Sequence, residues 1–142
     1  MKCIVKQIDD LQGLAVDLLE NINSYSVVAL KGQMGVGKTT FIQFVLKAMG
    51  IEKLDGSPSY SLINQYESLF FGIVYHLDLY RLDNIEEIYD IGIEEIIYKK
   101  SICFIEWPEL MLDILPADTL WIEITLEEDF SRLINIKYDN KS

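Results

Sequence analysis

The sequence has few of the residues on which several classes of protein depend. Its 142 residues include one histidine and two cysteines, Cys3 and Cys103. No apolar run approaches the roughly 20 residues that a membrane-spanning helix needs. Two separated cysteines in apolar stretches exclude a disulfide framework and a cysteine metal cluster. The first ten residues turn acidic at Asp9 before an apolar signal core can form. We therefore expect a cytoplasmic protein that has no secretory leader and makes no membrane contact.

Basic residues are scarce as well. Lysine and arginine number 12 against 23 aspartates and glutamates, which gives a net charge of −11. A field of this sign repels the phosphates of nucleic acids, so we expect any role in a nucleic-acid process to depend on a protein partner. Half of the residues are apolar, which is enough for one core in a chain of this length. Residues 1–142 are therefore predicted to form a single domain.

Hydrophobic periodicity places helices and strands along the chain. An amphipathic helix is predicted over residues 11–22, with Asp9 or Asp10 as its cap, and a second helix runs from Phe41 to a stop at Gly50. A third, short helix is predicted from a cap at Asn84 to Gly92. Strands are predicted over residues 26–30, 62–66, 72–79 and 101–105, and two alternating segments, 120–126 and 133–138, suggest a C-terminal hairpin.

The strongest motif lies between the first predicted strand and the second predicted helix. Residues 32–39 match the phosphate-binding pattern Gly-x-x-x-x-Gly-Lys-Thr. Glycines let backbone N–H groups wrap a phosphate, Lys38 is placed to reach the β- and γ-phosphates, and the Thr39 hydroxyl is placed to ligate Mg²⁺. The alternative is a glycine-rich turn that caps an ordinary helix, but the strand–loop–helix context favours the phosphate site. We therefore predict that the chain binds ATP and Mg²⁺.

Two carboxylates are candidates for the acid that such a loop needs at the end of a neighbouring strand. Glu106 ends the predicted strand 101–105, and Asp78 lies in the run His76-Leu77-Asp78-Leu79-Tyr80-Arg81. The alternatives are a turn acid before Pro108 for Glu106 and a solvated strand residue for Asp78. For His76 we favour a satisfied structural role over a general base. For Tyr80 and Trp107 we favour core packing over stacking on a base.

Two absences narrow the class of nucleotide-binding protein. No Asn-Lys-x-Asp segment supports guanine specificity, and the arginine clusters of small-molecule kinases are missing. A transition-state arginine must therefore be Arg81, Arg132 or a residue of another protein. We expect ATP hydrolysis by the isolated chain to be slow.

Taken together, the motifs resemble those of the bacterial TsaE family, also called YjeE. The resemblance covers nearly the whole chain, and it rests on the loop 32–40, Ser57-Pro58-Ser59-Tyr60-Ser61-Leu62, the run 76–82, Ile105-Glu106-Trp107-Pro108-Glu109, Leu115-Pro116 and Arg132. It implies an α/β, P-loop NTPase-like, three-layer domain with a mixed, mostly parallel central sheet. It also implies a Mg²⁺-dependent ATPase that acts with the TsaB–TsaD complex in threonylcarbamoyladenosine modification of tRNA, next to the anticodon.

The resemblance also assigns roles to residues. It implies that Thr39 and Glu106 ligate Mg²⁺, that Lys38 binds phosphate and that Asp78 is an essential acid. It implies an ATP-binding set that lies in the loop and the tail, namely Gly35, Val36, Gly37, Lys38, Thr39, Thr40 and Arg132, with Arg132 near the base. A switch-like loop near the γ-phosphate is implied for Ser57, Ser59, Tyr60 and Ser61.

Three positions depart from the family pattern, and two other functions stay open. Gln33 stands where an acid is usual, whereas Ser59 and Ser61 replace threonine and keep its hydroxyl. One alternative function is a nucleotide-gated binding module, in which ATP occupancy controls partner docking without a need for hydrolysis. The other is a small-molecule phosphotransferase, which we consider the weaker.

Overall fold

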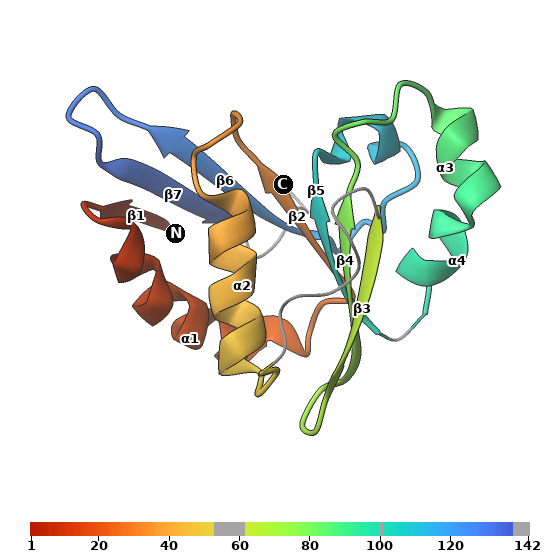
Figure 1. Cartoon of the computed structure of the whole chain (residues 1–142), viewed down its shortest axis with the longest axis horizontal. Helices are drawn as coiled ribbons and strands as arrows, with labels where there is room; N and C mark the ends of the chain where they lie inside the picture. Colours follow the sequence, from red (N-terminus) through yellow and green to blue (C-terminus); the bar gives the residue numbers. More distant parts are fainter. Residues whose placement is uncertain (53–61, 100, 138–142) are drawn as a thin grey trace.

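The computed structural model describes residues 1–52, 62–99 and 101–137. A central sheet of 7 strands has the order β1-β7-β6-β2-β5-β4-β3 (Figure 1). The elements in chain order are β1 Lys2–Val5, η1 Ile8–Asp10, α1 Leu11–Ile22, β2 Val27–Lys31, α2 Lys38–Ala48, β3 Ile63–Ser68, β4 Gly72–Asp78, α3 Ile85–Ile91, α4 Ile93–Ile97, β5 Ile102–Glu106, η2 Pro108–Met111, β6 Leu120–Leu126 and β7 Arg132–Lys137.

The sheet is mixed and mostly parallel, as predicted. Strand β2 pairs in parallel with β5 and β6, and β4 pairs in parallel with β5. The pairs β3–β4, β6–β7 and β1–β7 are antiparallel. Only β3 and β7 therefore run against the common direction. The predicted C-terminal hairpin is present as β6 and β7.

Burial explains why the central strands occupy the middle of the sheet. All residues of β5 and four of the five residues of β2 are buried. A strand buried on both faces has a continuous apolar sequence rather than an alternating one, and Val27–Lys31 and Ile102–Glu106 are such runs. Glu106 is the exception, because it is a carboxylate inside the buried end of β5.

Helices cover the two faces of the sheet unequally. Helices α1 and α2 lie over the face that presents Leu30, Phe104 and Ile122, and both are seen in front of the sheet in Figure 1. Helices α3 and α4 and the turn η2 pack on the opposite face, over Leu77 and Ile105 of β4 and β5. Strands β4 and β5 therefore have helices on both faces, which is the expected three-layer arrangement.

Several predicted elements differ in detail from those in the structure. Strand β5 includes Glu106, whereas the predicted strand stopped at Ile105. Helix α2 begins at Lys38 inside the phosphate motif and ends before Gly50, whose φ is +89°. Asn84 caps α3 as predicted, because its side chain accepts a hydrogen bond from the N–H of Glu87.

Asp10, one of the two predicted caps, occupies the N-cap position of α1, but its side chain makes no capping hydrogen bond to that helix. Its carboxylate accepts instead from the N–H of Gln7, at 3.2 Å, the residue that precedes η1. Strand β1 and helix α4 were not predicted. Four residues are too few to show a period, and α4 follows the predicted helix stop at Gly92 at once. Among the described residues, no helix has both the length and the apolar character needed to span a membrane.

Candidate functional site

The glycine loop connects the carboxyl end of β2, the middle strand of the sheet, to the start of α2 (Figure 1). Gly35 and Gly37 have φ values of +81° and +112°, which side chains with a Cβ rarely adopt. A Cβ on Gly32 would lie 2.7 Å from the carbonyl oxygen of Ile124 in β6. Gly37 is also the N-cap of α2, so the positive end of that helix points at the loop. The local sequence therefore folds into the backbone cradle that anion binding requires.

Lys38 is held inside this cradle. Its side chain is only 4% exposed, and its Nζ donates a hydrogen bond to the carbonyl oxygen of Gly32 at 2.6 Å. The same Nζ lies 3.4 Å from the centroid of the Trp107 ring, a cation–π contact. Burial lowers the pKa of Lys38, and the carboxylates of Glu106, Glu109 and Asp78 partly oppose this shift. The ammonium group is therefore positioned at the cradle before any phosphate is bound.

The acidic side of the site depends on the pairing of β4 with β5. The parallel register puts Asp78 opposite Glu106 at the ends of the two strands. Glu106 is 2% exposed, and the Thr39 Oγ lies 2.8 Å from its Oε1 and 3.0 Å from its Oε2. Because a carboxylate only accepts, the Thr39 hydroxyl donates this hydrogen bond. The two residues predicted to ligate Mg²⁺ are thus in direct contact.

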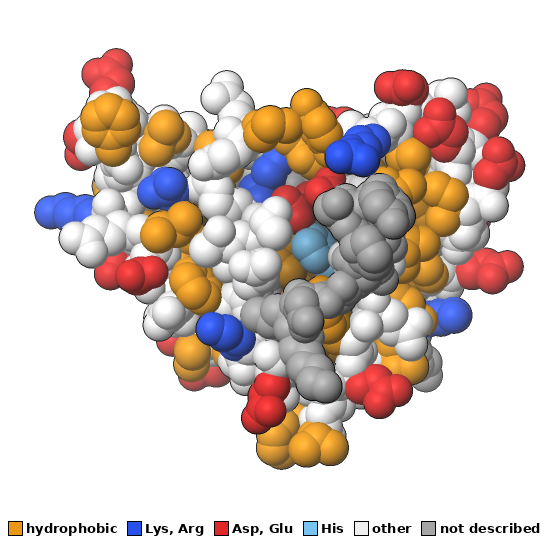
Figure 2. All heavy atoms as spheres, viewed as in Figure 1, with side chains coloured by type: hydrophobic (Ala, Val, Ile, Leu, Met, Phe, Trp, Pro, Cys, Tyr) orange, Lys and Arg blue, Asp and Glu red, His pale blue; other side chains and the backbone are white. Residues whose placement is uncertain are grey.

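His76 also contacts Glu106. Its Nε2 lies 2.6 Å from Oε2 of Glu106, and its side chain is 10% exposed. Figure 2 shows the single histidine of the chain in a hollow in the middle of this face, next to acidic side chains. We predicted a satisfied structural residue, and His76 is hydrogen-bonded. Its partner, however, is the candidate metal ligand. Sequence reasoning missed this contact, because it depends on the pairing of β4 with β5, in which Asp78 lies opposite Glu106.

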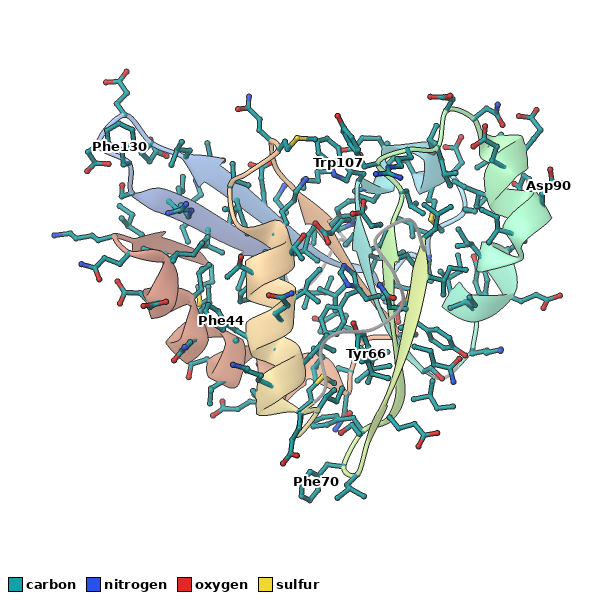
Figure 3. The ribbon with its side chains drawn as sticks, viewed as in Figure 1. Phe44, Tyr66, Phe70, Asp90, Trp107 and Phe130 are labelled. Carbon is teal, nitrogen blue, oxygen red and sulfur yellow. The ribbon has the colours of Figure 1, made fainter. Side chains whose placement is uncertain are left out.

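Asp78, Tyr80 and Trp107 form one rim of the site. The carboxylate of Asp78 accepts a hydrogen bond from the backbone N–H of Tyr80 at 3.1 Å. The Tyr80 ring lies 5.0 Å from the Trp107 ring, and Figure 3 shows Trp107 beside the glycine loop. Tyr80 is 52% exposed, so core packing was wrong for this residue. Trp107 is half-buried and packs partly against the cluster that contains α3 and α4.

A cleft of about 280 Å³ opens between the loop and this rim. Its lining includes seven of the predicted site residues, namely Gly35, Gly37, Lys38, Thr39, Thr40, Asp78 and Glu106. A hydroxyl and carboxylates are the oxygen ligands that Mg²⁺ prefers. No cluster of three or more His, Cys, Asp or Glu ligands exists in the described part of the chain. The Thr39 hydroxyl and the Glu106 carboxylate are oxygen donors of the kind that fit a magnesium ion.

Arg132 lies against the loop. Its Nε donates a hydrogen bond to the carbonyl oxygen of Val36 at 2.6 Å, so the first residue of β7 supports the cradle. Its predicted position near the nucleotide base stays a prediction. The switch-like residues Ser57, Ser59, Tyr60 and Ser61 lie outside the described residues. Gln33 is exposed at the outer side of the loop, and it lines a second cavity of about 570 Å³ with Trp107 and Glu109.

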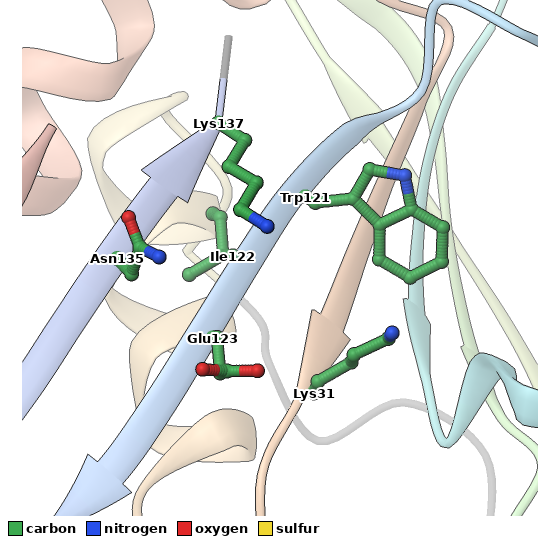
Figure 4. Close-up of a pocket in the computed structure, with 6 residues that line it drawn as sticks. All are labelled: Lys31, Trp121, Ile122, Glu123, Asn135 and Lys137. Carbon is green, nitrogen blue, oxygen red and sulfur yellow. The ribbon is translucent and has the colours of Figure 1, made fainter. Parts of the chain in front are cut away.

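Another cavity, of about 190 Å³, lies away from the loop, along β2, β6 and β7 (Figure 4). The ammonium of Lys31 lies 4.7 Å from the ring centroid of Trp121, and Lys137, Asn135 and Glu123 complete the lining. Each carboxylate, amide or amine there comes from the exposed side of a strand. This cavity contains none of the predicted site residues, and we therefore place the candidate site at the glycine loop.

Comparison with known proteins decides the family. The model of the family described as threonylcarbamoyl adenosine biosynthesis protein TsaE matches residues 5–134. The chain belongs to the TsaE family. It is similar to the tRNA threonylcarbamoyladenosine biosynthesis protein TsaE of Treponema pallidum, with 31% identity over 96% of this chain and 99% of that protein. A similarly named protein of Rickettsia bellii is 34% identical over 94% of this chain and 92% of its own length.

Other relatives extend the comparison of this TsaE-family chain to a solved structure. The TsaE protein of Borreliella burgdorferi is 40% identical over 67% of this chain and 69% of its own length. A crystal structure of Bacillus subtilis YdiB superposes with a TM-score of 0.75, covering 99% of this chain and 87% of that one, at 24% identity. The predicted family and the predicted fold class are thereby confirmed.

Proposed function

We propose that this chain is a Mg²⁺-dependent, slowly hydrolysing ATPase of tRNA threonylcarbamoyladenosine biosynthesis, and that it acts on the TsaB–TsaD complex. One observation carries the proposal: Lys38, Thr39, Asp78 and Glu106 converge on one cleft at the glycine loop of a TsaE-family chain. The names of the relatives place those proteins in tRNA threonylcarbamoyladenosine biosynthesis. The net charge of −11 supports action through protein partners, with tRNA contacted only indirectly.

The residues of the cleft suit separate tasks. The loop N–H groups and the Lys38 ammonium would bind the β- and γ-phosphates, and Thr39 and Glu106 would hold Mg²⁺. A bound magnesium ion would neutralise charge that develops on the phosphate oxygens. Asp78 lies opposite Glu106 at the cleft and has no metal-binding task in this assignment, so its carboxylate would orient or deprotonate a water molecule.

Slow turnover by the isolated chain follows from the positions of its two arginines. Arg132 is bonded to the loop backbone, and Arg81 is exposed beyond the rim. Neither lines the cleft. An arginine supplied to a transferring phosphoryl group accelerates hydrolysis by about 10³–10⁵ in P-loop enzymes. We infer that a partner protein supplies the missing charge.

The test compares ATP turnover of the purified chain alone with turnover in the presence of TsaB and TsaD. We expect stimulation by the complex, and loss of that stimulation in the Lys38→Ala variant. The Lys31→Ala variant is the matched control, because Lys31 lies in the cavity on β2, β6 and β7 and not in the cleft. Turnover that is fast without partners, or that ignores TsaB and TsaD, would contradict the proposal.

One observation favours the second function, a nucleotide-gated binding module. The side chains proposed to bind nucleotide and metal make hydrogen bonds within the site, because Lys38 donates to Gly32 and Thr39 donates to Glu106. ATP binding would exchange these contacts, so occupancy alone can change the surface presented to a partner. Comparing Asp78→Ala with Lys38→Ala separates the two functions. If Asp78→Ala binds ATP, has no turnover and still supports tRNA modification, gating without hydrolysis is the function.

A further inference from the structure

We propose that His76 is a positioning residue for Glu106, which fixes the carboxylate of the magnesium ligand in the orientation that metal binding needs. The inference rests on the proposed function and adds a residue to its site. His76 lies in β4, two residues before Asp78, and Glu106 ends the neighbouring strand β5. Nε2 of His76 lies 2.6 Å from Oε2 of Glu106.

The carboxylate is held from two sides. Thr39, in the first turn of α2, donates to it from the loop side, at 2.8 Å from Oε1. His76 contacts Oε2 from inside the sheet. Thr39 is exposed and belongs to the phosphate-binding segment, whereas His76 is buried in β4, between β5 and β3. The histidine therefore provides the contact that does not depend on the arrangement of the loop.

The alternatives for His76 fit the geometry less well. A general base must reach a water in the cleft, but the His76 ring is not part of the cleft wall and its Nε2 is occupied by Glu106. A purely structural histidine would pair with a group that has no other task, whereas Glu106 reaches the cleft. Because the carboxylate of Glu106 accepts only, the bond places the proton on Nε2 of His76.

Removing the contact should therefore act on magnesium rather than on the nucleotide. Residues that orient a metal ligand typically change metal affinity by about 10–100-fold when they are mutated. In His76→Leu the donor is lost while much of the side-chain volume is kept. In His76→Gln an amide N–H₂ remains near the position of Nε2. We expect the first variant to need about 10–100-fold more Mg²⁺ and the second to stay within a few-fold of wild type.

The measurement is equilibrium binding of a fluorescent ATP analogue to the full chain, titrated with Mg²⁺ from a metal-free, chelator-treated start. Nucleotide affinity without metal should be equal in wild type, His76→Leu and His76→Gln. Thermal unfolding checks that each variant is folded. If His76→Leu does not fold, His76→Asn replaces it, because its shorter amide ends near Nδ1 and does not reach Glu106.

Three results would overturn the inference. The magnesium requirement of His76→Leu, or of His76→Asn, could equal that of wild type. The Leu and Gln variants could be impaired equally, which would mean that the donor at Nε2 is not the cause. In the His76→Leu variant, nucleotide affinity without metal could fall along with magnesium affinity, which would indicate a general disruption of the site. If wild type binds the analogue with no response to Mg²⁺, the proposed metal site itself fails, and that outcome is distinct from the others.

Discussion

The two sides of the cleft are built in different ways. The phosphate side is contiguous in the chain, since residues 32–39 supply the loop, the lysine and the threonine. The acidic side is assembled from two strands, and Asp78 meets Glu106 only because β4 and β5 pair in that register. Local backbone chemistry therefore determines the first side, and the long-range topology of the sheet determines the second.

Two contacts join the two sides of the cleft. The Thr39 hydroxyl donates to Glu106, and the Lys38 ammonium lies over the Trp107 ring that follows β5. A third contact, from Arg132 in β7 to the Val36 carbonyl, fixes the loop to the opposite part of the sheet. Substitutions at these positions separate what the loop does alone from what the sheet does for it.

The largest effect on stability and nucleotide binding is expected from Gly32→Ala, which changes the backbone of the glycine loop. The new Cβ would meet the Ile124 carbonyl oxygen at 2.7 Å and a Val36 methyl at 2.9 Å, so the backbone must shift. We expect the free energy of unfolding to fall by about 2–3 kcal/mol, and binding of MgATP to be lost. Urea unfolding and calorimetry measure the two quantities.

Gly13→Ala is the matched control for this substitution. Gly13 lies exposed in α1, and its added Cβ would have no atom within 4 Å. Replacing a glycine in a helix by alanine should stabilise the protein by about 0.5–1 kcal/mol and leave MgATP binding unchanged. An unaltered free energy of unfolding in Gly32→Ala would mean that the loop has space that the structure does not show.

The same division explains what the sequence could predict. The phosphate side follows from residues 32–39 alone, because each requirement for glycine, lysine and threonine is local. The family motifs also include Asp78 and Glu106, which the structure places in the lining of the same cleft. The contact between His76 and Glu106 could not be predicted, since neither alternation nor spacing fixes which neighbouring strand β4 pairs with or in what register.

Exposure was the other quantity that the sequence did not determine. Tyr80 is aromatic and follows a buried strand, which favours core packing, yet the chain turns at the end of β4 and leaves the ring at the rim. The supporting role of Arg132 was missed for a similar reason. It lies 96 positions after Val36, and only the β6–β7 hairpin brings it to the loop.

A smaller effect is expected from Arg132→Met, which removes the support of the loop by β7. Hydrogen bonds to a charged group contribute about 1.5–3 kcal/mol, and the Arg132 contact is only partly buried. We expect unfolding to become easier by about 1.5 kcal/mol, with weaker MgATP binding because the Val36 backbone is no longer held. Arg132→Lys should recover part of both. Equal affinity for MgATP in wild type and Arg132→Met would show that the loop needs no support from β7.

Thr39→Val breaks the contact between the two sides. It keeps the shape of the side chain and removes the donor to Glu106, which stays buried with His76 as its other partner. A cost of about 1 kcal/mol in the free energy of unfolding is expected without any ligand. Thr39→Ser, which keeps the hydroxyl, should match wild type more closely. Chemical denaturation of the three proteins decides the point, and identical midpoints would mean that the bond adds no net stability.

The smallest effect concerns the pH dependence of Lys38. Burial puts its pKa below the ordinary value of 10.5, although Glu106, Glu109 and Asp78 partly offset this shift. Below the folded-state pKa the lysine is protonated in both the folded and the unfolded chain, so the cost of burying the ammonium is fully present. Between that pKa and 10.5 the unfolded chain binds more protons at this position, so the contribution of Lys38 to the free energy of unfolding rises with pH.

Lys38→Met has no ammonium to bury and lacks this contribution. The free energy of unfolding of wild type, minus that of the variant, should therefore increase as the pH is raised from 7 toward about 10.5. Urea unfolding at a series of pH values measures the difference. A difference that stays level or decreases would mean that the buried lysine is not destabilised by its position in the loop. Burying the Lys38 ammonium would then not lower the free energy of unfolding, and its hydrogen bond to Gly32 would compensate for the loss of hydration.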